Sequence, residues 1–242
     1  MTARIQTVSF QGVEVKPIDV EVQLSVGAVA FIVVGLPDKA VAESRERVRG
    51  ALNALGLSLP PKRVTVNLAP ADTPKEGSHY DLPIAIGLLV AMGILPPDEM
   101  SQYLVLGELS LNATIRDVAG VLPAAMHATE QNLGIICPEN CGSEAAWAGE
   151  DLDILAPRDL LQVINHIKGT QVLSRPPLPD ASQDTRDLGP DLSEVKGQES
   201  ARRALEIAAA GGHNLLMCGP ARVGKINARL LFAEYFTVSL SA

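Results

Sequence analysis

A glycine-rich stretch near the end of the 242-residue chain has nearly the composition of a phosphate-binding loop. In "LLMCGPARVGKINARLL", two glycines and a lysine have the spacing of the G-x-x-x-x-G-K-[ST] pattern. Such a loop binds phosphates because backbone N–H groups converge on them, with the lysine ammonium beside the β- and γ-phosphates. The pattern predicts a nucleotide site formed by Gly219, Pro220, Ala221, Arg222, Val223, Gly224, Lys225 and Ile226.

The last residue of this loop departs from the pattern. Ile226 stands where a serine or threonine hydroxyl normally coordinates Mg²⁺. We therefore expect ATP as the cofactor, weakened binding of its magnesium complex, and hydrolysis that is impaired more than binding.

The loop needs a strand before it and other elements to position that strand. Residues 214–218 are apolar and predict this strand, and a helix is expected from Gln198 to the glycines at 211 and 212. Residues 169–192 contain four prolines, several acids and no hydrophobic period, which is typical of a linker. We expect three regions: a domain over 1–168, this linker, and the start of an ATPase domain over 193–242.

The first 168 residues show a succession of strand and helix patterns. Strands are expected within 5–10, 19–24, 28–37 and 62–72, and Asp38 should cap a helix that ends at Gly56. The charged residues of this helix, Arg47 among them, mix both signs and favour a solvated face. A buried helix follows over 81–93, and helices then alternate with strands up to residue 169. The fold class is therefore α/β (α+β) with a layered core.

Composition excludes several function classes. The formal net charge of −8 argues against nucleic-acid binding through broad phosphate neutralisation. Cys137 and Cys141 have neither a second pair nor a nearby histidine, so thiols in a reducing cytosol are favoured over a zinc site. The N-terminus has no signal-peptide pattern, and the longest apolar run, 82–97, is too short to span a bilayer. These features predict a cytoplasmic protein.

Four stretches carry a resemblance to a known family. They are "VGLPDKAVAESRERVRGAL", "VTVNLAPADTPKEGSHYDLPIAIGLL", "LGELSLNATIRDVAGVLPAA" and "DLSEVKGQESARRALEIAAAGGHNLLMCGP". Together they resemble the ComM (YifB-like) subfamily of magnesium-chelatase-related AAA+ ATPases. The resemblance implies a Lon-protease-like N-terminal domain, an AAA+ motor, and ATP-driven branch migration of DNA by hexameric relatives. It also implies a glycine where Arg222 stands, a change that costs about 1 kcal/mol if the backbone there needs a positive φ.

The resemblance raises the question of a peptidase site. The Lon-like catalytic serine would fall on His79, with Ser78 one residue early, and the catalytic lysine would fall on Leu122. A one-residue offset directs a side chain elsewhere, and Lys75 and His79 supply no recognisable third group. We therefore expect no peptidase activity and no catalytic residues in this domain.

Beyond Leu231 the residues "FAEYFTVSLSA" do not resemble the family. We expect a truncated motor with ATP-binding ancestry and little turnover, through an altered reading frame or a disrupted gene. The alternative is a non-enzymatic assembly module based on the Lon-like domain. The partners expected are further copies of the chain or full-length ComM-type subunits, with DNA contact implied by the resemblance alone and no membrane partner.

Overall fold

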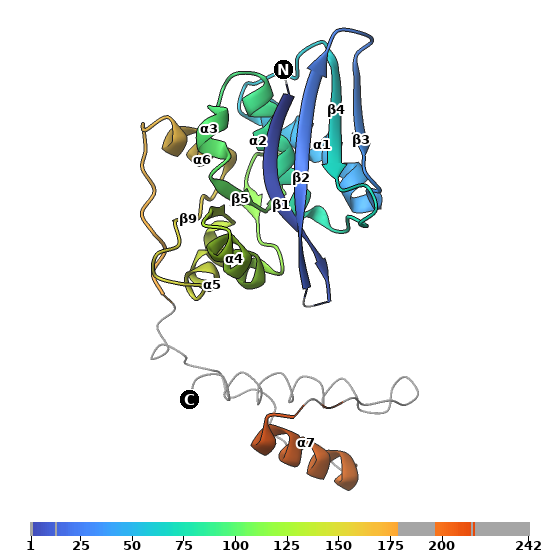
Figure 1. Ribbon diagram of the computed structural model, residues 1–242, viewed down its shortest axis with the longest axis vertical. Helices are drawn as coiled ribbons and strands as arrows, with labels where there is room; N and C mark the ends of the chain where they lie inside the picture. Colours follow the sequence, from blue (N-terminus) through green and yellow to red (C-terminus); the bar gives the residue numbers. More distant parts are fainter. Residues whose placement is uncertain (1, 13, 179–196, 214, 216–242) are drawn as a thin grey trace. The chain divides into compact units, whose positions relative to one another are not determined.

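The computed structural model describes residues 2–12, 14–178, 197–213 and 215, in two compact units (Figure 1). The first unit covers Met1–Pro179 and the second covers Asp180–Ala242. Within the described ranges, no helix is long and apolar enough to cross a membrane.

The first unit is built on one mixed sheet whose strands, in the described part of the chain, have the order β3-β4-β2-β1-β5-β8-β9. The strands are β1 (Thr2–Gln11), β2 (Glu14–Ser25), β3 (Ala30–Val34), β4 (Arg63–Ala69), β5 (Tyr103–Val105), β8 (Gly134–Ile136) and β9 (Ile154–Leu155). β2 pairs antiparallel with both β1 and β4. β3 pairs in parallel with β4. On the other side, β1 pairs in parallel with β5, β5 with β8, and β8 with β9. A separate hairpin joins β6 (Glu108–Leu109) to β7 (Ile115–Arg116).

Helices surround this sheet unevenly. The α-helices are α1 (Lys39–Ala54), α2 (Asp81–Ala91), α3 (Pro97–Met100), α4 (Val121–Glu130), α5 (Gly142–Ala146) and α6 (Leu160–Ile167). Short 3₁₀ helices, η1 (Ser78–Tyr80) and η2 (Glu139–Cys141), precede α2 and α5.

Strands β2 and β4, and the first half of β1, carry helices mainly on one face, whereas Val8 of β1 already belongs to the second core with α4. Their inward residues, such as Ile5, Val20 and Val66, join one core with α1 and α2. All eleven residues of α2 are buried, and Gly87 lets the helix approach β2 closely, because a Cβ there would lie 2.6 Å from Val22 Cγ2. The opposite face carries polar pairs, including Arg4 with Asp19 at 2.7 Å. Figure 1 shows α1 and α2 together behind these strands.

Strands β5, β8 and β9 are covered on both faces. Ile136 and Leu155 share the core of α2 and α6. The alternate residues Leu104, Ile135 and Ile154 pack instead in a second core with α4 and α5. These strands therefore read as continuous apolar runs, which is the pattern of parallel strands buried on both faces.

The α/β class predicted from the sequence is confirmed. Asp38 is the N-cap of α1 as predicted, since its Oδ1 accepts a hydrogen bond from Val41 N at 2.7 Å. The prediction of a solvated face is wrong for Arg47, whose side chain is only 22% exposed and contacts buried Asp81. Periodicity on one helix could not show this, because the partner carboxylate lies 34 residues further along the chain.

The segment after α6 lies along the first unit as far as the structure describes it. Arg175 donates hydrogen bonds to the carbonyl oxygens of Leu152 and Gly149, at 2.6 and 2.7 Å. Leu173 N donates to His166 Nδ1 at 2.9 Å. The beginning of the predicted linker is therefore held to the domain by backbone and side-chain contacts.

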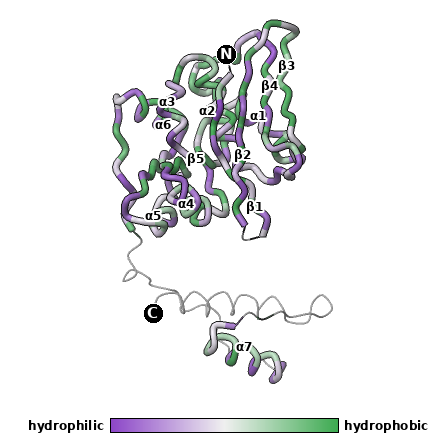
Figure 2. The backbone as a smooth tube through the Cα atoms, viewed as in Figure 1, coloured by the Kyte–Doolittle hydropathy of each residue, from purple (hydrophilic) through white to green (hydrophobic). Residues whose placement is uncertain are grey.

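The described part of the second unit contains α7 (Glu199–Gly211). Gly212 follows it in the left-handed conformation, with φ 60°, as expected for a helix C-terminus. Leu205 and Ala208 are buried, whereas Ile207 is half exposed. Figure 2 shows the corresponding mixture of hydrophobic and hydrophilic colours along α7.

Candidate functional site

The loop between β4 and α2 lies at the carboxyl end of β5, the edge where open α/β sheets usually bind ligands. Backbone hydrogen bonds fix it there: Gly107 N donates to His79 O, and Leu82 N donates to Gly107 O, both at 3.0 Å. The residues proposed from the Lon resemblance, Ser78 and His79, are in this loop.

Asp38 ties the loop to the start of α1. Its Oδ1 caps the helix, while its Oδ2 accepts a hydrogen bond from Gly77 N at 3.2 Å. Its backbone N–H donates to Lys75 O at 2.9 Å. One aspartate therefore both begins the helix and positions the residues just before Ser78.

Ser78 is half buried, and its hydroxyl donates a hydrogen bond to Glu108 Oε2. Glu108 was not among the residues predicted from the sequence. The available signal was an acidic residue three positions after a buried strand, in "YLVLGEL", where a parallel strand ends at the ligand-binding edge.

The His79 ring is held away from a catalytic role. Its Nε2 lies 2.9 Å from Val8 O, so this nitrogen carries the proton, because a carbonyl oxygen only accepts. The ring packs between Phe10 and Tyr80, at centroid distances of 5.5 and 4.1 Å. Burial lowers the pKa of His79, which keeps the ring neutral.

Beside this loop, Asp81 at the start of α2 is fully buried and paired with Arg47. Arg47 Nε donates to Oδ2 at 2.5 Å and Nη2 donates to Oδ1 at 3.0 Å, a two-bond arrangement. Leu109 N also donates to Oδ2, at 3.1 Å. Since both carboxylate oxygens accept hydrogen bonds, Asp81 links α1, α2 and β6 and is poorly placed to act as a base.

Lys75 is buried as well, and its ammonium donates a hydrogen bond to the carbonyl oxygen of Pro70 within the same loop. Burial lowers its pKa. The lysine therefore stabilises the loop by joining two of its own residues, and its hydrogen bond is to Pro70 and not to Ser78.

The geometry does not assemble a serine–lysine pair at the matching positions. Leu122, at the expected lysine position, lies in the first turn of α4 and donates its backbone N–H to Glu144 Oε1 at 3.0 Å. His79, at the expected serine position, is tied to β1. The expectation of no peptidase activity stays a prediction, and these contacts support it.

The two described cysteines are both buried. Burial raises the pKa of Cys137 to about 12, so its thiol is protonated at neutral pH. The Sγ atom of Cys141 lies 3.8 Å from the carbonyl oxygen of Val118. Both thiols belong to the second core, where they act as small apolar side chains.

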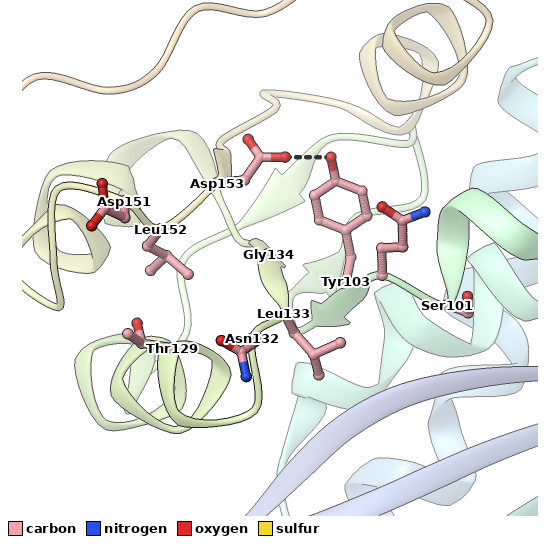
Figure 3. A pocket seen from close by; sticks show the side chains of 10 residues that line it. Ser101, Tyr103, Thr129, Asn132, Leu133, Gly134, Asp151, Leu152 and Asp153 are labelled. Atoms are coloured by element: carbon pink, nitrogen blue, oxygen red, sulfur yellow. Dashed lines mark hydrogen bonds between the residues drawn. The ribbon is translucent and has the colours of Figure 1, made fainter.

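A polar pocket of about 460 Å³ lies at the opposite, amino ends of β5, β8 and β9 (Figure 3). Tyr103 donates its hydroxyl hydrogen to Asp153 Oδ2 at 2.5 Å across one side of it. Gly134 is required there, because a Cβ would lie 2.6 Å from the Tyr103 ring. Its place at the strand amino ends, away from the usual ligand-binding edge, leads us to assign it no function.

The predicted nucleotide site, residues 219–226, lies outside the described residues. Of the elements expected to position it, the structure describes α7 and not the following strand.

Two family models match the sequence. Residues 20–141 match the model of subunit ChlI of Mg-chelatase, and residues 191–233 match the model named magnesium chelatase, subunit ChlI. The chain therefore belongs to the class of proteins with ChlI-type domains, and its α/β fold agrees with this class.

Relatives specify the class further. The chain is 42% identical over 221 residues to YifB of Escherichia coli (strain K12), covering 91% of this chain and 43% of that protein. It is 39% identical over 221 residues to competence protein ComM of Haemophilus influenzae, covering 88% of this chain and 42% of that one. The chain belongs to the ComM/YifB-like subfamily of magnesium-chelatase-related proteins. It spans less than half the length of these relatives.

Proposed function

We propose that the chain is a nucleotide-binding protein of the ComM type, with residues 219–226 holding the phosphates of ATP. The observation that carries the proposal is the Gly219–Gly224–Lys225 pattern inside the segment that matches the magnesium-chelatase model. One relative is named a competence protein, and the family resemblance implies branch migration of DNA. We therefore further propose a role in DNA uptake and recombination.

We also propose that turnover is slow or absent. Ile226 has no oxygen to coordinate Mg²⁺, and the metal normally neutralises charge on the β- and γ-phosphates during hydrolysis. Binding through backbone N–H groups and Lys225 depends less on that hydroxyl, so binding should survive better than hydrolysis.

Titration of the full chain with a fluorescent ATP analogue, with and without Mg²⁺, tests the proposal. We expect saturable binding that is lost in Lys225→Ala and kept in the control Lys62→Ala, which removes an exposed lysine of the first unit. Ile226→Thr should tighten binding only when Mg²⁺ is present. If the folded wild-type chain shows no saturable binding, the nucleotide proposal fails.

That failure would favour the alternative, a non-enzymatic assembly module based on the first unit. The observation in its favour is that the described residues around Ser78 make hydrogen bonds within the domain. The domain would then act through contacts of its surface with partners.

A further inference from the structure

Strand β3 forms one edge of the sheet. Among the described residues its only strand partner is β4, with which it pairs in parallel from Ala30 to Val34 (Figure 1). One row of its backbone N–H and C=O groups therefore faces away from the sheet. Such a row is a template for another strand.

Proteins usually protect an edge strand with a charged residue, a proline, a bulge or a short length. β3 reads Ala-Phe-Ile-Val-Val and contains neither a charge nor a proline. Its tube has hydrophobic colours throughout (Figure 2). The uncharged stretch extends over residues 22–37, between Glu21 and Asp38.

Exposed apolar side chains gather around this strand. Val26 and Val29 before it are 96% and 71% exposed, and Leu36 after it is 60% exposed. Val34 within the strand is 41% exposed. An isolated exposed valine is ordinary, but four large apolar side chains within eleven residues along an open edge indicate an interaction surface.

We propose that β3 pairs with β3 of a second copy of this chain, in antiparallel orientation about a two-fold axis near Ile32. In that pairing Phe31 lies beside Val33 of the partner subunit on the face that packs against the helices. Both residues already contact that core in one copy. The two sheets would then continue as one, with their helix layers on the same side.

Charge favours a second copy over a charged partner. The chain carries a net charge of −8, so two copies repel each other over most of their surface. The β3 stretch is uncharged and therefore brings them together where this repulsion is least. A two-fold contact requires only that the surface complement itself, and a strand of apolar, mostly β-branched residues does so.

The interface is small. Five paired residues a side should bury less than the roughly 1,000 Å² expected of a stable interface, so we expect a weak dimer that forms only at raised protein concentration. The proposal concerns the first unit alone and does not depend on nucleotide binding.

Sedimentation velocity of the full chain, from about 1 to about 200 μM, tests the pairing at concentrations suited to a weak interface. We expect the wild type to shift from monomer to dimer. Val34→Lys, which puts a charge on the edge, should stay monomeric throughout. Val172→Lys is the matched control, because this valine is 75% exposed and lies after α6. It should dimerise like the wild type.

Hydrogen exchange on the same samples identifies the surface. The amides of residues 30–34 that face the open edge should gain protection as concentration rises, and less so in Val34→Lys. A wild type that stays monomeric overturns the proposal. Concentration-independent protection of these amides would mean that another part of the chain covers the edge, and a dimer unaffected by Val34→Lys would mean that the contact lies elsewhere. Either result also overturns it.

Discussion

The two halves of the sheet use the same kind of strand in different ways. Strands β2 and β4 bury one face under α1 and α2 and leave polar side chains on the other, where Asn67 donates to Glu21 at 2.9 Å. Strands β5, β8 and β9 bury both faces, because α4 and α5 cover the side that β2 and β4 leave open.

This difference in covering explains where each half of the sheet can offer side chains for chemistry or for binding. In the doubly covered half most strand residues are buried in one of the two cores, so polar side chains that could do chemistry lie at the strand ends, as Ser78 and Glu108 do. In the singly covered half, one sheet face and the β3 edge remain available to solvent or to partners. The Arg47–Asp81 pair lies in the helix layer of this half.

Removing this pair should have the largest effect. Arg47→Ala leaves the carboxylate of Asp81 buried without its counter-ion, which should lower the free energy of unfolding by about 3–5 kcal/mol. Urea denaturation of the full chain measures it. Arg45→Ala is the control, because Arg45 is 48% exposed and, within the described part of the chain, pairs with Glu46 alone, so about 0–1 kcal/mol is expected. Equal losses in the two variants would show that the helix layer does not depend on the pair.

A matched pair of alanine substitutions compares the same side of the sheet in the two halves. Ile135→Ala in β8 removes a side chain buried against α4 and α5 and should cost about 2–5 kcal/mol. Gln23→Ala in β2 alters the open face and should change stability by about 0.5 kcal/mol or less. Denaturant midpoints at equal slope give both values. A large loss in Gln23→Ala would contradict the open face.

His79 links the loop before α2 to β1 through its hydrogen bond to Val8 O. Titration of its ring should have the smallest effect on stability. The unfolded imidazole takes up a proton near pH 6.5, whereas burial moves the pKa of the folded ring lower. As pH falls below about 6.5 the unfolded state therefore binds more protons, and stability should fall by at most about 1.4 kcal/mol per pH unit for this one group.

Above that pH the contribution of His79 to stability is constant. Unfolding curves between pH 4.5 and 8 measure the slope, and His79→Gln, which keeps a donor for Val8 O, should flatten it. An unchanged slope in this variant would assign the pH dependence to other groups.

Local patterns in the sequence were sufficient for several features. Asp38 was identified as a cap because a carboxylate before an apolar period satisfies free N–H groups at a helix start, a contact three residues long. The α/β class followed from alternating periods for the same local reason. The nucleotide loop rests on spacing of this kind too, and it stays a prediction because its residues lie outside those described.

Other features depended on contacts between distant residues. Arg47 looked like one charge on a mixed helix face, and Glu108 had no predicted role, until the fold placed them beside Asp81 and Ser78.

The sequence by itself determined the class of the fold, the start of α1 and the spacing of the predicted phosphate loop, since each depends on residues a few positions apart. Only the tertiary structure decided the strand order, the uneven covering of the sheet and the open edge at β3. Periodicity records which residues of a strand turn inward, but not which strand or helix lies beside it.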